Sequence, residues 1–159
     1  MSKKSTEKKL KVVAVSGGFD PVHVGHARMF KEAKKLGDIL VVILNNDNWL
    51  KDKKGFAFMP EEERAELIRH LRHVDEVVIT EHAPGDPDRS VCRELRMVKP
   101  DIFANGGDRN KGNIPEVSVC EEIGREMSFN IGSGGKVQSS AWRLSNFLEQ
   151  AAPKNKPQK

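Results

Sequence analysis

The chain has 159 residues, of which 37% are hydrophobic and 31% are charged. This length suits one domain with a full hydrophobic core, and no window approaches the roughly 20 apolar residues that a membrane-spanning helix needs. The N-terminus has lysines but lacks the apolar segment of a signal peptide, so we expect a cytoplasmic protein. Cys92 and Cys120 are far apart in apolar helical settings, which is typical of buried thiols in a reducing compartment.

The formal net charge of +4 is concentrated at the two ends of the chain. Five lysines and one glutamate give residues 1–11 a net charge of +4, and three lysines give residues 152–159 a net charge of +3, so the remainder carries −3. Short polar tails of this kind more often increase the solubility of a protein than bind a partner. We therefore expect disordered basic tails at 1–11 and 151–159, one domain at 12–150, and neither nucleic acid nor membrane as a partner.

A glycine-rich turn joins the first predicted strand to the first predicted helix. The apolar run at 12–15 is typical of a buried strand, and residues 27–36 have the apolar spacing of an amphipathic helix. Glycines let backbone N–H groups approach an anion, and the start of a helix adds positive potential. His23 and His26 are three residues apart, so both rings can project to one side of the turn, with Gly25 leaving space for a ligand.

Strands and helices alternate along the rest of the chain. We predict strands at 38–44, 75–80, 101–104 and 129–131, and helices from 59–60 onward, at 87–98, at 116–125 and from Ser139-Ser140 to Gln150. Residues 48–58 are predicted to be a loop that carries Lys51, Lys53 and Lys54. The pattern predicts an α/β fold: a Rossmann-like, doubly wound, mostly parallel five-stranded sheet with helices on both faces.

In such sheets the ligand binds beyond the carboxyl ends of the strands. Four polar loops are predicted at that edge, at residues 17–26, 45–54, 105–109 and 132–140. Two imidazoles, several lysines and a glycine-rich turn suit the phosphates of a nucleoside triphosphate. The sequence therefore predicts a nucleotide site at this edge.

The segment from Gly17 to His26 resembles the signature of the cytidylyltransferase-like nucleotidyltransferases, in which His23-Val24-Gly25-His26 has the form His-x-Gly-His. The nearest relatives by this resemblance are the glycerol-3-phosphate cytidylyltransferases and the heptose-phosphate adenylyltransferase domains. The resemblance covers roughly residues 12–147. It implies transfer of a nucleoside monophosphate to a small phosphorylated acceptor with release of pyrophosphate, and it implies a homodimer.

Particular residues match the motifs of this family. Lys51-Asp52-Lys53 matches a Lys-x-Lys loop of the glycerol-3-phosphate enzymes, and Arg64 matches a characteristic arginine. Lys136 stands near the usual position of another arginine, as a point charge without bidentate geometry. The resemblance implies that His23, His26, Lys51 and Lys53 are catalytic. It implies nucleotide contacts from Gly17, Gly18, Phe19, Asp20, Gly25, Arg64, Gly107, Asp108, Lys136, Ser139 and Ser140.

A phosphate nucleophile is already anionic, so the implied reaction needs no general base. Catalysis would consist of positioning and charge stabilisation, with Mg²⁺ on the β- and γ-phosphate oxygens and no metal site in the protein itself. The Lys-x-Lys match favours CTP, with an ATP-dependent adenylyltransferase of a sugar phosphate as the alternative. The acceptor stays open between glycerol phosphate, a sugar phosphate and another small phosphorylated molecule.

Each motif residue also has a structural interpretation. Asp20 and Asp108 suit turns, Ser139 and Ser140 suit a helix N-cap, Arg64 and the lysines suit a solvated surface, and both tryptophans suit packing. A dehydrogenase would need Gly-x-Gly-x-x-Gly, which is absent, and a zinc site at the two histidines would lack paired cysteines. Aminoacyl-tRNA synthetases share a similar His-x-Gly-His, but this chain has no room for tRNA-binding domains. A non-catalytic nucleotide- or nucleic-acid-binding module stays open as a further alternative.

Overall fold

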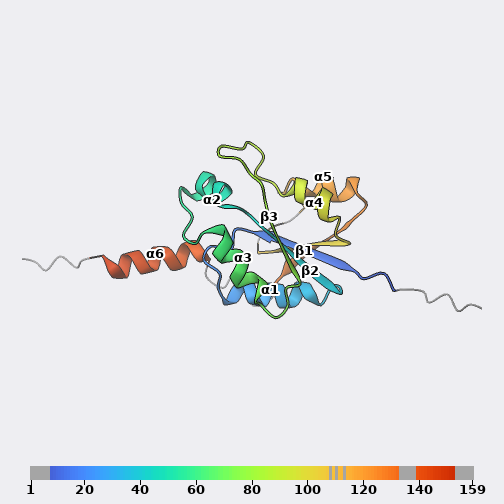
Figure 1. The fold of residues 1–159 in the computed structure, drawn as a ribbon, viewed down its shortest axis with the longest axis horizontal. Coiled ribbons are helices and arrows are strands. Elements are labelled where there is room, and N and C mark those ends of the chain that lie inside the picture. Colours follow the sequence, from blue (N-terminus) through green and yellow to red (C-terminus); the bar gives the residue numbers. More distant parts are fainter. Residues whose placement is uncertain (1–7, 108, 110, 113, 133–138, 153–159) are drawn as a thin grey trace, which may run out of the picture.

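The computed structural model describes residues 8–107, 109, 111–112, 114–132 and 139–152. Five strands form one sheet in the order β3-β2-β1-β4-β5, and every neighbouring pair is parallel (Figure 1). The strands are β1 (Val12–Gly17), β2 (Ile39–Leu44), β3 (Glu76–Ile79), β4 (Ile102–Gly106) and β5 (Glu126–Ile131). The helices are α1 (Val24–Lys34), α2 (Asp47–Lys54), α3 (Glu61–Arg69), α4 (Cys92–Val98), α5 (Glu116–Glu122) and α6 (Ser140–Ala151).

The two faces of the sheet carry separate hydrophobic clusters. On one face, Val13 and Val15 of β1 pack with Phe30 of α1 and Ile68 of α3. On the other face, Ala14, Ile43 and Phe103 pack with residues of α4 and α5. Strands buried on both faces read as continuous apolar runs, which is why the sequence shows them so clearly. The predicted doubly wound, Rossmann-like fold is confirmed.

The segment after β2 was predicted wrongly. Residues 48–58 were expected to form a loop, but Asp47–Lys54 is the helix α2. The Asn46 side chain caps it by accepting a hydrogen bond from the Trp49 N–H at 3.0 Å, and Gly55 ends it in the left-handed region at φ 86°. The lysine-rich composition favoured the loop prediction. Asn46 as the N-cap and Gly55 after the last turn nevertheless mark the two ends of a helix.

The observed ends of several other helices and strands differ from the predicted ends by a few residues. α4 begins at Cys92 rather than at 87, because the Asp88 carboxylate accepts hydrogen bonds from the N–H and the hydroxyl of Ser90 and holds the chain in a turn. Pro60 has an extended ψ of 146° and is the N-cap of α3 rather than its first helical residue. α1 begins at Val24, three residues before the predicted start, and β5 begins at Glu126, three residues before its predicted start.

The carboxyl ends of β1, β2 and β4 lead into the loops that the sequence placed at one edge. α6 extends away from the sheet, with its first residues close to the turn after β1 (Figure 1). Of the two predicted tails, residues 1–7 and 153–159 lie outside the described residues. Among the helices that the structure describes, none is long and apolar enough to cross a membrane.

Candidate active site

A cavity of about 840 Å³ opens at the carboxyl edge of the sheet. The turn after β1, helix α2, the loop after β4, the end of β5 and the start of α6 all contribute to its wall. The predicted site residues that line it are Gly17, Gly18, Phe19, Asp20, His23, Gly25, His26, Lys53, Gly107, Ser139 and Ser140. Lys51 and Arg64 are not among the lining residues, and Asp108 and Lys136 lie outside the described residues.

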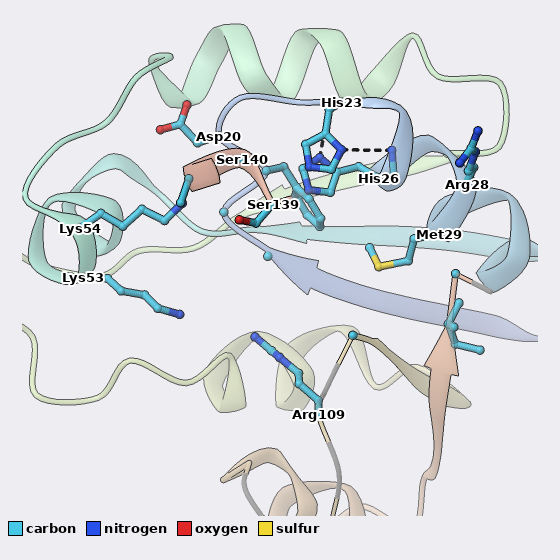
Figure 2. A pocket seen from close by; sticks show the side chains of 18 of the residues that line it. Asp20, His23, His26, Arg28, Met29, Lys53, Lys54, Arg109, Ser139 and Ser140 are labelled. Carbon is cyan, nitrogen blue, oxygen red and sulfur yellow. Dashed lines mark hydrogen bonds between the residues drawn. The ribbon is translucent and has the colours of Figure 1, made fainter. Parts of the chain in front are cut away.

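The two histidines cap the start of α1 reciprocally (Figure 2). The Gly25 N–H donates to His23 Nδ1 at 3.1 Å, and the His23 N–H donates to His26 Nδ1 at 3.2 Å. The rings stack with their centroids 3.8 Å apart. Because each Nδ1 accepts a hydrogen bond, the proton of each neutral ring lies on Nε2. The cap thus fixes both rings as single N–H donors.

The surroundings keep both imidazoles neutral. Burial lowers the pKa of His26 to about 3, with further contributions from His23, Lys54 and Arg143. Burial, followed by the positive charge of Arg143, also lowers the pKa of His23. At neutral pH the pair is therefore uncharged, and it suits donation of hydrogen bonds to an anion.

Asp20 anchors the loop between α2 and α3. It is 1% exposed, and its carboxylate accepts hydrogen bonds from the N–H groups of Phe58 at 2.7 Å and Met59 at 2.8 Å. Both oxygens thus have backbone partners, which supports the structural interpretation of this residue. Asp20 still lines the cavity, so it sets the shape of the wall.

Arg64 is fully buried, so its interpretation as a surface residue is wrong. Its guanidinium donates to the carbonyl oxygens of Met59 at 2.9 Å, Gly18 at 2.6 Å and Asn45 at 2.8 Å, and it pairs with Asp47 Oδ1 at 2.6 Å. These bonds join the glycine turn, the end of β2 and the start of α2. The structure gives Arg64 a positioning role behind the cavity wall.

The lysines of α2 divide into two groups. Lys53 and Lys54 line the cavity, whereas Lys51 does not. Lys53 Nζ lies 4.4 Å from the centroid of the Trp49 ring. Burial lowers the pKa of Lys53, as do the positive charges of Arg109, Lys54 and Arg89. This concentration of partly desolvated cations is suited to phosphate.

Several cavity residues were missed by the sequence analysis. Arg28 on α1 and Arg109 after β4 add positive charge, and Met29 adds an apolar surface (Figure 2). Lys54 on α2, which the sequence analysis named with Lys51 and Lys53, adds a further charge. The helical spacing of α1 was the only signal for Arg28 and Met29. Arg109 directly follows the Gly-Gly-Asp segment, and that position was the available signal for it.

The start of α6 joins the histidine turn through its two serines. Ser139 Oγ accepts a hydrogen bond from the Trp142 N–H at 3.2 Å, and Ser140 Oγ donates to the Pro21 carbonyl at 3.0 Å. Trp49 is buried as predicted and donates through Nε1 to the Arg89 carbonyl at 2.8 Å. Trp142 is 46% exposed, so it packs less completely than Trp49.

The described residues include no group of three or more His, Cys, Asp or Glu side chains that could hold a metal ion.

A doubly wound parallel sheet with a capped pair of histidines at a cationic cavity is an α/β domain whose site is suited to phosphate groups. Residues 14–125 match the model of the cytidylyltransferase-like family, and the chain belongs to that family. The resemblance seen in the His-x-Gly-His segment is thereby confirmed.

Several known proteins are similar to this chain over more than half of its length. An FAD synthase of Thermococcus sibiricus is 43% identical over 125 residues, which are 77% of this chain and 78% of that protein. An FAD synthase of Pyrococcus horikoshii is 37% identical over 123 residues, which are 77% of this chain and 74% of that protein. The match to an FAD synthase of Pyrococcus abyssi, at 42% identity, covers 62% of this chain and 64% of that one. The bifunctional protein HldE of Nitratiruptor sp. is 34% identical over 71% of this chain but only 24% of its own length.

Solved structures of other proteins share the fold. A lipopolysaccharide core biosynthesis protein from Thermoplasma volcanium has a TM-score of 0.60 and 30% identity, covering 76% of this chain and 94% of that one. Pantoate-beta-alanine ligase from Francisella tularensis has a TM-score of 0.59 at 16% identity, covering 89% of this chain and 67% of that one. The second likeness concerns the fold alone.

Proposed function

We propose that this protein is an adenylyltransferase that transfers AMP from ATP to a small phosphorylated acceptor, and that the acceptor is flavin mononucleotide. FAD consists of AMP joined to flavin mononucleotide through a pyrophosphate, and the FAD synthases of Thermococcus sibiricus and Pyrococcus horikoshii are 43% and 37% identical to this chain. This proposal replaces the sequence-based preference for CTP. That preference depended on Lys51, which lies outside the cavity.

The reaction is a displacement at the α-phosphorus of ATP. An oxygen of the acceptor phosphate forms the new P–O bond as the bond from the α-phosphorus to the bridging oxygen breaks, and pyrophosphate leaves with that oxygen. The attacking phosphate oxygen is already ionised, so no proton has to be removed. Mg²⁺, when bound, neutralises charge on the β- and γ-phosphate oxygens, which supply its ligands.

The observation that carries this proposal is the neutral, stacked histidine pair. With Nδ1 of each ring engaged in the cap, each Nε2–H is the donor that the ring can offer to a non-bridging phosphate oxygen. Preorganised donors of this kind stabilise charge that develops on a transferring phosphoryl group. Lys53, Lys54 and Arg109 add positive charge around the leaving pyrophosphate and the acceptor phosphate.

A pyrophosphate-release assay tests the proposal. ATP and CTP are each combined with flavin mononucleotide, a heptose 1-phosphate and glycerol 3-phosphate in Mg²⁺, and the products are identified by mass spectrometry. We expect pyrophosphate release and FAD formation with ATP and flavin mononucleotide only. Turnover with CTP and glycerol 3-phosphate would overturn the choice of nucleotide. Turnover with the heptose phosphate would favour the sugar-phosphate alternative, which the similarity to HldE supports.

A further inference from the structure

Residues 80–91, which join β3 to α4, form a loop that lies beside helix α2 (Figure 1). At the start of α2, the side-chain amides of Asn46 and Asn48 both donate to the His82 carbonyl oxygen, at 2.9 Å and 3.0 Å. In the second turn, Asp52 Oδ2 accepts from a backbone N–H of the loop at 2.7 Å. The loop therefore contacts α2 from its N-cap to its second turn.

The imidazole of His82 links the two ends of this loop. It is 3% exposed and is not among the residues that line the cavity. Its Nε2 lies 3.0 Å from the Ser90 carbonyl oxygen, and its Nδ1 lies 2.8 Å from Thr80 Oγ1. A carbonyl oxygen can only accept, so Nε2 carries the proton in the neutral ring and Nδ1 accepts from the Thr80 hydroxyl. Thr80 Oγ1 in turn accepts from the Asn46 N–H at 3.0 Å, so the ring also connects to the N-cap of α2.

The far end of the loop fixes the ring of a tryptophan. Arg89 directly precedes Ser90, and its carbonyl oxygen accepts from the Trp49 Nε1–H at 2.8 Å. Trp49 lines the cavity, and Lys53 Nζ lies 4.4 Å from the centroid of its ring. Lys53 is four residues after Trp49 and shares its face of α2, so the ammonium group is held over the indole by a cation–π interaction. The orientation of the indole therefore determines where Lys53 lies.

A buried histidine is an unfavourable choice if the loop needs only to be packed. Burying a polar ring costs free energy unless each nitrogen has a partner, and an apolar side chain would fill the same space without that requirement. Hydrogen bonds are directional, however, so a fully paired buried network holds one arrangement. The arrangement held here leads to a cation at the cavity, where a small displacement of a charged group weakens its interaction with a ligand.

We propose that His82 is a positioning residue for Lys53, acting through the loop and the Trp49 ring without touching the ligand. The contact of Lys53 with phosphate rests on the proposed function, whereas the contacts from His82 to Trp49 do not depend on it. Removal of the His82 ring releases the loop, the Trp49 ring shifts with the carbonyl that holds it, and Lys53 binds phosphate less tightly.

Two substitutions of His82 and one control separate positioning from packing. His82→Leu fills a similar space but removes both hydrogen bonds of the ring. His82→Gln is the conservative variant, because its amide N–H can still donate to the Ser90 carbonyl. Leu36→Ala is the control for a loss of stability alone, since Leu36 packs against the core cluster and is not among the cavity residues. Thermal melting shows that each variant is folded at the assay temperature.

The first measurement is the Kd for inorganic pyrophosphate in Mg²⁺, by titration calorimetry. We expect His82→Leu to raise this Kd about tenfold, within the range of coupling for residues in one contact network, and His82→Gln to restore most of the affinity. In a Lys53→Ala background, His82→Leu should have no further effect, because the group that it positions is absent. Leu36→Ala should match the wild type.

The second measurement is tryptophan fluorescence, which tests the contacts from His82 to Trp49 without a ligand. The chain contains two tryptophans, so Trp142→Phe leaves Trp49 as the single emitter. In this background His82→Leu should shift the emission of Trp49, because the indole N–H loses its fixed acceptor. Leu36→Ala in the same background should leave the emission unchanged.

The possible failures are distinguishable. If the wild-type protein binds neither pyrophosphate nor ATP, the proposed function is wrong, and the phosphate contact of Lys53 is wrong with it. If His82→Leu leaves the Trp49 emission unchanged, the positioning role is wrong whatever the titrations give. If His82→Leu weakens pyrophosphate binding equally with and without Lys53, its effect is structural and the positioning role is again wrong, while the proposed function stands.

Discussion

At the scale of single residues, His23 performs two tasks that one substitution can separate. Its Nδ1 caps α1 by accepting from the Gly25 N–H, and its Nε2–H is available to a phosphate. Asparagine is a good N-cap residue, but its shorter side chain does not place a donor at the position of Nε2. The cap and the catalytic donor are therefore carried by different atoms of one ring.

We predict that His23→Asn lowers kcat by roughly 10²–10³-fold, the effect of removing one preorganised donor, while the free energy of unfolding changes little. His23→Ala should lower kcat similarly and also lower the free energy of unfolding by about 1 kcal/mol, because the cap is lost. Steady-state kinetics and urea unfolding of both variants provide the comparison. Near wild-type kcat in His23→Asn would exclude a catalytic role for this ring.

The lowered pKa of His26 predicts how the free energy of unfolding depends on pH. Its pKa is lowered to about 3 in the folded protein, against 6.5 for the unperturbed residue. Below pH 6.5 the unfolded state therefore binds a proton that the folded state does not. The contribution of His26 to stability is full above pH 6.5 and is lost as the pH falls, by at most about 1.4 kcal/mol per pH unit.

The check is urea unfolding of the ligand-free protein at several values between about pH 5 and 6.5, where few carboxylates titrate. His26→Asn should show a shallower dependence on pH than the wild type, because asparagine does not titrate. Identical slopes in the two proteins would mean that burial does not hold the ring neutral.

At the scale of elements, α2 determines which lysines reach the ligand. The sequence analysis treated Lys51-Asp52-Lys53 as a loop in which both lysines contact phosphate. In the helix, residues two positions apart do not share a face, so only one of the two can turn to the cavity. Lys53 lines the cavity, and Lys51 does not.

This difference predicts unequal effects of two otherwise equivalent substitutions. Lys53→Ala should weaken binding of ATP, of the acceptor or of both, by about 1.5–3 kcal/mol in total, the range for a hydrogen bond to a charged group. Lys51→Ala should leave both affinities unchanged. Titration of each variant with each ligand in Mg²⁺ separates the two lysines, and equal losses in both would contradict the placement of α2.

Arg64 connects three segments that the sequence separates by up to 46 residues. Lysine has the same charge but lacks the planar fork that reaches several acceptors at once. We predict that Arg64→Lys lowers the free energy of unfolding by about 2–4 kcal/mol, because buried carbonyl groups and Asp47 lose their partners.

The control is Arg69→Lys, at an exposed position on the same helix, which should be close to neutral. Chemical denaturation of the two variants measures the difference. Equal stabilities would show that water or a rearranged lysine replaces the guanidinium.

At the scale of the whole molecule, the sequence predicted the fold better than the details of the site. The strands follow from buried apolar runs, and the His-x-Gly-His turn is local in sequence, so both could be recognised. The cavity contains Arg28, Lys54 and Arg109 because tertiary packing brings α1, α2 and the loop after β4 together. The burial of Arg64 likewise depends on backbone carbonyls, which no residue pattern displays.

The exposed face of α6 bears on the predicted homodimer. Phe147 and Leu148 are 65% and 66% exposed, and Leu144 shares their face at helical spacing. An apolar stripe of this kind, unburied on a helix that extends from the body, is typical of an interaction surface (Figure 1). A second copy of the chain is the partner that we predict, because the family resemblance implies a dimer.

Light scattering at micromolar concentration should therefore give twice the chain mass of 17.8 kDa. Leu148→Glu should shift the protein to monomer, since a charge in an apolar interface is costly, whereas Gln150→Glu at an exposed position of the same helix should not. α6 also supplies Ser139 and Ser140 to the cavity, so dimerisation through its far end would hold the near end in place. If the wild-type protein is a monomer, the homodimer prediction is wrong. If Leu148→Glu remains a dimer, the interface does not involve this face of α6.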